Sequence, residues 1–344
     1  MSPHLVILIR LIGPVLLSAA LCALVMRFGI KDAPDGGRKT QAAPVPNAGG
    51  VAILLTTVLS CWIAARSGFM SDRWTADGAG LILAASMLAG VIGLVDDMFG
   101  MAAKVKLGLL LLVSGGLAAF GPQLQVPGLP ALLAMTGVGL WILITINAVN
   151  FMDGSNGLAL GSSAIMLLGA ADILTAQPGT LWAFARDPDT AFVAGTAALA
   201  IFGFLAWNLP GRLYAGDSGA LGIGALFGGV STVVAQVTTV WTAAILFLPF
   251  LVDVMLTIFW RASRGRSVMT AHREHAYQLF LRAGWNHLPV AMIWWALSMG
   301  CWVAAAHTPD HLAPWVFQGL AVAGSGLWLV QRLTLGRRLI AEGR

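Results

Sequence analysis

The stretch NAVNFMDGSNGLA, residues 147–159, concentrates polar side chains at three-residue spacing between two long apolar runs. Its polar members are Asn147, Asn150, Asp153 and Asn156. An Asn amide both donates and accepts hydrogen bonds, and a carboxylate accepts them or binds a cation. A lone Asp in such a turn is ordinary, because turns favour Asn, Asp and Gly for backbone reasons. The unusual feature is the density of these groups in so apolar a chain.

Two other segments carry acids beside apolar runs. Asp96 and Asp97 lie in GLVDDMFGMAAKVKL, with Lys104 and Lys106 close behind, and Asp217 lies in YAGDSGALGIG. Carboxylates at a membrane boundary are costly unless they are paired, hydrated or bound to a cation. Mg²⁺ takes one or two carboxylates, several waters and substrate phosphate oxygens. One such Asp could be an ordinary solvated loop acid, but four on one face favour a Mg²⁺ site, with Mn²⁺ as an alternative ion.

A basic segment follows a later apolar run. It contains Arg261, Arg264, Arg266, His272, Arg273 and His275. Arg binds phosphate bidentately, and His can hydrogen-bond phosphate or transfer protons. A cytoplasmic loop can also be basic for topology alone. A zinc site at the two His residues is disfavoured, because Glu274 is the one nearby acid and Cys is absent from the segment.

Two further acids interrupt apolar runs. Asp253 lies inside a predicted membrane helix, about 12 Å along the axis from Arg261 at 1.5 Å per residue. An ionisable group at that depth is either functional or a buried structural acid paired with a neighbouring helix. Both interpretations stay open. Asp172 lies near the outer end of another run, where reaching toward water explains it.

The composition places these residues in a membrane protein. Of 344 residues, 58% are hydrophobic and 10% are charged, against about 25% charged in soluble domains. The three cysteines form no C-x-x-C pair, and the net charge of +5 accompanies no nucleic-acid motif. We therefore predict an all-α polytopic fold with residues 1–344 as a single integral membrane domain, a lipid bilayer as its surroundings and no nucleic-acid partner. The first apolar run is interpreted as a retained span rather than a signal peptide.

About 20 apolar residues span a bilayer as a helix. Eleven segments meet this criterion: 4–27, 47–66, 78–95, 105–120, 131–147, 156–176, 190–209, 218–236, 239–259, 287–306 and 312–332. The loops that follow the odd-numbered spans, together with the C-terminus, hold sixteen Lys and Arg residues, and the segments on the other side hold four. This bias predicts a cytoplasmic C-terminus and a periplasmic N-terminus. The acidic, Asn-rich and basic segments all fall on the cytoplasmic side, so we expect one polar site there, suited to phosphoryl transfer.

These motifs, in their order, resemble the bacterial polyprenyl-phosphate N-acetylhexosamine-1-phosphate transferases over nearly the whole chain. GLVDD resembles the first acidic motif of that superfamily, NAVNFMDGSNGLA its Asn-rich motif, and GDSGALGIG its Gly-Asp-x-Gly motif. LPFLVD with Arg261 resembles a late helix motif, and HREHAYQ resembles the His motif of the branch that starts O-antigen chains. The superfamily also includes the muramoyl-pentapeptide transferases of peptidoglycan synthesis.

The resemblance implies a reaction and its residues. Undecaprenyl phosphate would attack the β-phosphorus of a UDP-N-acetyl sugar and release UMP in the bacterial inner membrane, initiating O-antigen or another cell-surface glycan. Asp96, Asp97 and Asp153 would be catalytic, with Asp217 and Asp97 holding the metal. The implied substrate-binding residues are Asn147, Asn150, Asn156, Lys104, Lys106, Arg261, His272, Arg273 and His275. The sugar is not specified, and a homodimer stays open.

Two positions depart from the superfamily pattern. Gln41 stands where a His is usual in the first loop, with an extra residue before Arg38, so the contribution of that His is in doubt. Asn156 replaces an acid that is common in relatives.

Three other functions fit parts of the sequence. A membrane prenyltransferase would need acids four residues apart, which Asp96, Asp97 and Asp153 lack. A secondary transporter coupled through Asp253 would need interrupted helices in two matching halves. An intramembrane aspartyl protease built on Asp217 would need a second acid facing it at depth.

Overall fold

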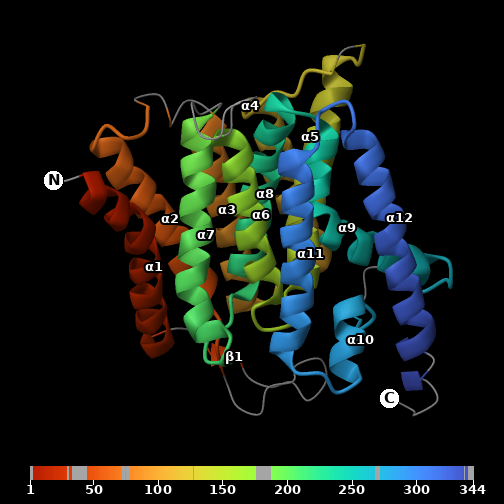
Figure 1. Cartoon of the computed structure of the whole chain (residues 1–344). Helices are drawn as coiled ribbons and strands as arrows, with labels where there is room; N and C mark the ends of the chain where they lie inside the picture. Colours follow the sequence, from red (N-terminus) through yellow and green to blue (C-terminus); the bar gives the residue numbers. More distant parts are fainter. Residues whose placement is uncertain are drawn as a thin grey trace.

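The computed structural model describes residues 3–28, 31–32, 45–71, 74, 78–126, 128–175, 187–267, 272–336 and 338–339. Within these ranges the chain is a bundle of helices (Figure 1), and eleven of them are long and apolar enough to cross a membrane. The helices are α1 (Pro3–Phe28), α2 (Gly49–Arg66), α3 (Gly78–Phe99), α4 (Ala103–Phe120), α5 (Ala131–Met152), α6 (Leu158–Thr175), α7 (Pro188–Asn208), α8 (Gly216–Val237), α9 (Val240–Ala262), α10 (Ala276–Arg282), α11 (His287–His307), α12 (Ala313–Gln331) and the π-helical turn η1 (Arg332–Gly336). The predicted all-α polytopic fold is confirmed.

The membrane helices match the predicted spans, but two of them extend further into the polar motifs. Helix α3 continues to Phe99 and α5 to Met152, beyond the last residues of their apolar runs. Gly100 ends α3 in the left-handed conformation, with φ of 68°, which a side chain disfavours. The acidic and Asn-rich motifs therefore begin on the last turns of helices rather than in loops, and their side chains have fixed directions.

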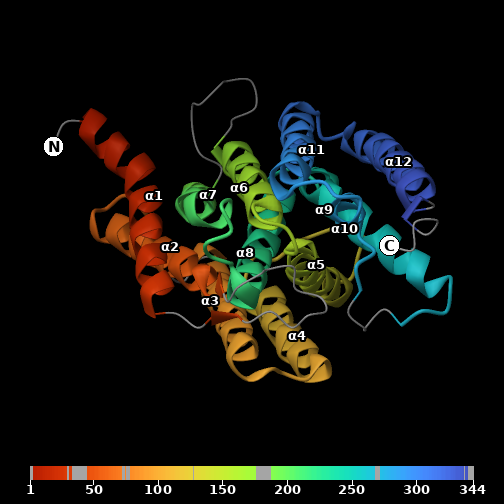
Figure 2. The same cartoon turned by 90° about the horizontal axis from the view of Figure 1, so that it is seen from below.

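Helix α8 is the centre of the bundle and is almost entirely buried. It packs against α2, α3, α5 and α6, which surround it when the molecule is viewed along the helices (Figure 2). Glycines permit the closest approaches: a Cβ on Gly50 would lie 2.0 Å from the Gly219 nitrogen, and one on Gly93 would lie 2.3 Å from the Asp217 carbonyl carbon. These contacts bring the ends of α2 and α3 against the first turn of α8.

A short connection ties the first loop to the same end of the bundle. Strand β1 (Lys31–Asp32) pairs antiparallel with β2 (Val45–Pro46), and Asn47 bridges to Tyr214 just before α8. The Gly49 and Gly50 backbone N–H groups donate to Tyr214 and Ala215, each over 2.9 Å. Asn47 is thereby fixed beside the start of α8. The first-loop departure, Gln41 with the extra residue before Arg38, lies outside the described residues.

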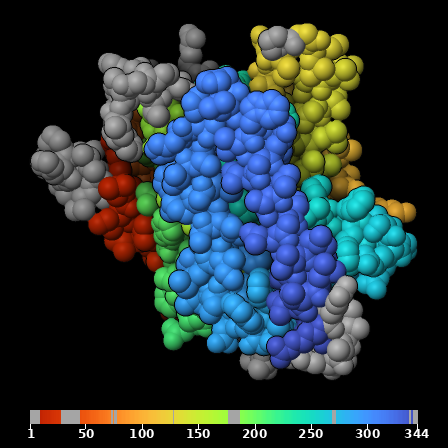
Figure 3. All heavy atoms as spheres, turned by 45° about the vertical axis from the view of Figure 1, so that its right-hand side comes forward, coloured from red at the N-terminus to blue at the C-terminus, as the bar shows by residue number. Residues whose placement is uncertain are grey.

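Helices α9, α11 and α12 form the other side of the molecule. Helix α9 packs on α11 and α12, and its C-terminal end extends outward from the bundle (Figures 1 and 2). Helices α11 and α12 cover one face (Figure 3), and α12 has large exposed apolar side chains such as Val322 and Leu327. A membrane protein presents such side chains to lipid. The short α10 lies at the same end of the bundle as β1 and the C-terminus (Figure 1).

Candidate active site

Three acidic motifs converge where α3, α5 and α8 meet. The Lys106 ammonium on α4 lies 2.8 Å from the Asp96 carboxylate and also pairs with Asp217. The other oxygen of Asp217 accepts a hydrogen bond of 2.8 Å from the Asn150 side chain. Both acids and the Lys are partly exposed, with 17 to 30% of their side-chain surface accessible. The predicted grouping of the acidic and Asn-rich motifs at one site is therefore present in the structure.

Asp97 lies on the other side of this cluster, between the first loop and α8. Its Oδ1 accepts from the Asn47 amide over 3.1 Å, and its Oδ2 faces the Ser218 backbone N–H at 3.4 Å. A Cβ on Gly216 would lie 2.5 Å from the same Oδ2, and Gly216 has a φ of 71°. Gly216 is thus required both by the left-handed backbone and by the closeness of Asp97.

Asp153 is the C-cap residue of α5 and lies near Asp217 and Asp97. Its removal from water raises its pKa well above the ordinary value, and the nearby charges of Asp217 and Asp97 raise it further. The turn after it is held firmly: the Gly157 N–H donates to Asn208 over 2.6 Å, and the Trp295 indole donates to the Gly157 carbonyl over 2.9 Å. The position of Asp153 is therefore set by residues far away in the sequence.

The charge of the cluster is unbalanced. Among the described residues, Asp96 and Asp217 pair with the Lys106 ammonium, and Asp97 and Asp153 lie close enough to Asp217 to feel its charge. Across the described ranges, no group of three or more His, Cys, Asp or Glu residues is arranged to hold a metal ion by itself. This arrangement fits poorly with zinc, which takes three or four protein ligands. It fits Mg²⁺, which takes one or two carboxylates and completes its shell with water and phosphate oxygens.

The other residues assigned to substrate lie around this centre with different roles. Lys104 is exposed on the first turn of α4. The Asn147 amide donates back to the Leu143 carbonyl of its own helix over 2.8 Å. The Asn156 backbone N–H donates to the His287 ring over 3.3 Å, and Ser155 contacts the same ring nitrogen at 3.0 Å. The structure thus places Asn150 in direct contact with Asp217, whereas the contacts of Asn147 and Asn156 are with other parts of the protein.

The His-containing segment packs on the end of α5. His275 is buried and its ring stacks on Phe151, with 6.0 Å between ring centroids. The Tyr277 hydroxyl donates to the Phe151 carbonyl over 3.0 Å, and burial raises the Tyr277 pKa. Since Asp153 follows Phe151 by two residues, the basic segment and the acidic cluster adjoin, as the sequence predicted.

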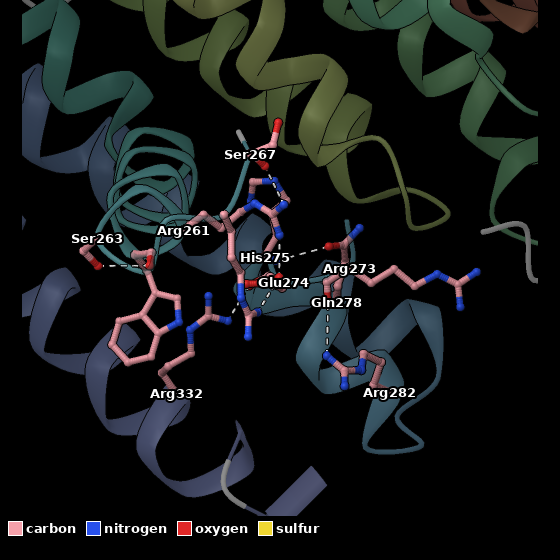
Figure 4. A network of polar contacts seen from close by, with 11 residues as sticks. Arg261, Ser263, Ser267, Arg273, Glu274, His275, Gln278, Arg282 and Arg332 are labelled. Carbon is pink, nitrogen blue, oxygen red and sulfur yellow. Dashed lines mark hydrogen bonds and ion pairs between the residues drawn. The ribbon is translucent and has the colours of Figure 1, made fainter. Parts of the chain in front are cut away.

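His272 and Arg273 precede the buried His275. Burial lowers the pKa of His272 to about 4, with further lowering from His275 and Arg261, so its imidazole is neutral near pH 7. The Arg273 carbonyl accepts from Arg282 over 3.2 Å, which closes the segment onto α10 (Figure 4). A neutral imidazole can both donate and accept a hydrogen bond.

Arg261 and Asp253 bind the protein itself in this structure. Arg261 is buried, pairs with Glu274 and donates to the Ser267 carbonyl over 2.6 Å (Figure 4). Asp253 is also buried; it accepts from the Ala276 N–H over 2.7 Å and lies 3.6 Å from the His275 ring. Of the two interpretations of Asp253, the geometry favours the buried acid that pairs with a neighbouring segment. Asp172 accepts from the Trp302 indole over 3.0 Å.

Several residues of the site were not identified from the sequence. Asn47, Asn208, Glu274, His287 and Arg332 contact the acids, the Asn-rich turn or the His segment. Asn47 lies six residues after Gln41 in the first loop, and Asn208 lies six residues before Tyr214; these positions near the motif segments were the available signal. Arg332 follows the last apolar run, where a basic residue is expected for topology alone.

Fold and site together define a polytopic membrane transferase with a carboxylate-rich site at one end of the bundle. Residues 79–235 match the glycosyl transferase family 4. Two similar proteins are phospho-N-acetylmuramoyl-pentapeptide-transferases, from Mycobacteroides abscessus (30% identity; 84% of this chain, 92% of the relative) and Desulfitobacterium hafniense (28%; 81% and 88%). The chain belongs to glycosyl transferase family 4, which confirms the superfamily resemblance.

Proposed function

We propose that this protein transfers an N-acetylhexosamine 1-phosphate, or its deoxy-sugar counterpart, from a UDP-sugar to undecaprenyl phosphate. An oxygen of the lipid phosphate attacks the β-phosphorus of the donor, and a new P–O–P bond forms. The bond from the β-phosphorus to the bridging oxygen breaks, so UMP leaves and undecaprenyl-diphospho-sugar remains. The observation that carries the proposal is the convergence of Asp96, Asp97, Asp153 and Asp217 at one site, where Lys106 and Asn150 both contact Asp217.

The charge imbalance of this cluster supports a divalent cation as part of the site. Asp217 and Asp97 are the residues that we expect to hold Mg²⁺, or Mn²⁺ in its place. When bound, the cation would neutralise the charge of the diphosphate. Lys106 already neutralises part of the carboxylate charge, and by pairing with both Asp96 and Asp217 it holds those two side chains close together.

The contacts of Asp97 favour direct attack by the lipid phosphate over a covalent aspartyl intermediate. Asn47 donates to one oxygen of Asp97, and the Ser218 N–H faces the other. Hydrogen bonds of this kind hold a carboxylate in place and weaken it as a nucleophile. A phosphate monoester is already largely dianionic at pH 7, since its second pKa is about 6. Asp97 therefore positions or deprotonates the acceptor, and a sugar-phosphorylated aspartate formed from UDP-sugar alone would contradict this role.

The donor is the least constrained part of the proposal. HREHAYQ resembles the O-antigen-initiating branch, which suggests N-acetylhexosamines or deoxy sugars such as N-acetylquinovosamine. The names of the similar proteins favour a second candidate, transfer of phospho-N-acetylmuramoyl-pentapeptide. With the first candidate, the product would start O-antigen or another cell-surface glycan. With the second, the product would serve peptidoglycan synthesis.

The location follows from the charge distribution. Sixteen basic residues against four favour a cytoplasmic site and C-terminus and a periplasmic N-terminus, in the inner membrane of a bacterium. The described motif-bearing segments lie at one end of the bundle, as this topology requires (Figure 1).

One experiment tests both donors. Purified protein is incubated with undecaprenyl phosphate, Mg²⁺ and single UDP-sugars: N-acetylglucosamine, N-acetylgalactosamine, N-acetylquinovosamine and N-acetylmuramoyl-pentapeptide. UMP release and the lipid product are measured. Release from an N-acetylhexosamine donor supports the first candidate, and release from the pentapeptide donor alone supports the second. UMP release from none of them, by protein that is folded and lipid-embedded, would contradict both.

A further inference from the structure

The end of α12 holds the His segment at two backbone positions. The Gln331 side-chain amide donates to the Ala276 carbonyl over 2.8 Å, and the Arg332 guanidinium donates to the Glu274 carbonyl over 2.6 Å. These two carbonyls flank His275, so the last residue of α12 and the first residue of η1 contact the chain on both sides of that imidazole. Figure 4 shows Arg332 reaching toward Glu274 from a helix separate from the rest of the segment.

The Arg332 side chain is itself fixed by aromatic packing. It is 7% exposed, and its guanidinium lies 4.7 Å from the Trp328 ring centroid and 5.2 Å from that of Trp260 on α9. Arg favours such stacking because its guanidinium is planar and weakly hydrated. The guanidinium therefore reaches Glu274 from a rigid support that α9 and α12 form together.

The backbone changes at the same residue. Helix α12 ends at Gln331, and the π-helical turn η1 begins at Arg332. Single turns of π-helix are uncommon and frequently occur at functional sites. Here the wider turn coincides with the two residues that contact the His segment. Elsewhere α12 packs mainly on α9 and exposes apolar side chains to lipid, so these contacts are its described link to the site.

The segment that α12 holds is the one that reaches the acidic cluster. His275 stacks on Phe151, and the Ala276 N–H donates to Asp253 over 2.7 Å. The 274–276 backbone is thus fixed by Asp253 of α9 on one side and, on the other, by Gln331 of α12 and Arg332 of η1. If α12 released it, His272 and His275 would lose their fixed distance from Asp153.

We propose that Gln331 and Arg332 are positioning residues that hold the His272–His275 segment against the end of α5, so that it binds the donor side of the substrate. This inference rests on the proposed function. It assigns to the last membrane helix a part in donor binding, through backbone contacts rather than through contact with substrate.

The kinetic test compares wild type, Arg332→Ala, Arg332→Lys, Gln331→Glu and Thr334→Ala. Arg332→Ala is expected to lower kcat/KM for the UDP-sugar by about tenfold, the scale of one hydrogen bond of the charged kind. The KM for undecaprenyl phosphate is expected to stay within about twofold, since the segment faces the donor.

Arg332→Lys keeps a hydrogen-bond donor for the Glu274 carbonyl and should be intermediate. Gln331→Glu removes the amide donor at equal size. Thr334, exposed and bonded to its own helix, is the control.

Hydrogen–deuterium exchange gives a readout that does not need activity. Amides of residues 272–278 should exchange faster in Arg332→Ala and Gln331→Glu than in wild type and Thr334→Ala. Unchanged exchange there, or equal losses for donor and acceptor, would overturn the positioning role. Absence of UMP release by wild type would instead overturn the proposed function, and the exchange comparison would still decide whether α12 holds the segment.

Discussion

The Asn150 side-chain amide donates to the Asp217 carboxylate over 2.8 Å, although 67 positions separate the two residues in the chain. The contact joins the Asn-rich end of α5 to the first turn of α8. Asn150 is an uncharged neighbour in a group of acids, so it fixes one oxygen of Asp217 without adding to the negative charge. The second oxygen pairs with Lys106.

Asp217→Asn should abolish most transfer activity while the protein still folds. The substitution keeps the size of the side chain but removes the charge that pairs with Lys106 and is proposed to bind Mg²⁺. We expect a loss of about a hundredfold or more, the scale for removing one electrostatic partner of the reaction. UMP release measures it, and Asp310→Asn, an exposed acid in the loop between α11 and α12, is the control. Full turnover by the variant, or by wild type in excess chelator, would remove the metal from the mechanism.

Lys106→Met should lower activity more than Lys104→Met. Lys106 is the ammonium that pairs with Asp96 and Asp217, whereas Lys104, two residues earlier on the same turn, is exposed. Without Lys106 the carboxylates repel one another, so we expect Mg²⁺ to be needed at a changed concentration as well as a lower kcat. Mg²⁺ titrations of the two variants separate these effects. Equal kinetics for both would show that the ion pair has no part in turnover.

Gly93→Ala should separate the two acidic motifs. Its Cβ would lie 2.3 Å from the Asp217 carbonyl carbon, so α3 and α8 must move apart. Overpacking of this kind costs about 1–3 kcal/mol, and a shift of Asp96 and Asp97 away from Asp217 should reduce turnover further. Gly108→Ala on α4 is the matched control, because nothing lies within 4 Å of its Cβ position. Thermal unfolding and UMP release are measured for both, and wild-type activity in Gly93→Ala would contradict the close packing.

His272 should make the free energy of unfolding depend on pH. Its charge does not change near neutrality, so it should add no pH dependence to donor binding there. Its folded pKa is about 4, below the ordinary value of 6.5, so the unfolded chain binds more protons between these values. Stability from this group is complete above about pH 6.5 and falls as the pH decreases toward 4. His272→Gln removes that loss. The thermal midpoint of the variant minus that of wild type should therefore increase as the pH is lowered from 7 to 5. His311→Gln, in the exposed loop before α12, is the control. A constant difference across this range would contradict the lowered pKa.

Asp153→Asn should be inactive but not destabilised. Burial and the neighbouring Asp217 and Asp97 raise the pKa of Asp153, which means that its charge is unfavourable in the folded protein. A neutral amide of the same size removes that penalty, as often happens where a site is built for function rather than stability. Thermal unfolding in chelator and UMP release with Mg²⁺ test the two halves. A large fall in the thermal midpoint would show that the carboxylate has a structural role.

The sequence determined the membrane class, the eleven spans and the grouping of the motifs at one end of the bundle. Apolar runs and charge asymmetry are properties of the sequence itself, so they can be identified without knowledge of the packing. Asp96, Asp97, Asp153 and Asp217 could be placed together because each adjoins a span end of the same parity. The motif pattern likewise indicated the family.

Tertiary structure decided which atoms of these groups meet. The family resemblance implied Lys106 and Arg261 as substrate-binding residues. The structure pairs Lys106 with two carboxylates and Arg261 with Glu274. The sequence did not predict the contacts of Asn47, Asn208 and Arg332, because the partners of these residues lie 50 or more positions away in the chain. Such contacts depend on how each helix is rotated and how closely its glycines allow it to approach its neighbours. Local periodicity does not contain that information, because the rotation and spacing of each helix follow from the packing of all the helices at once.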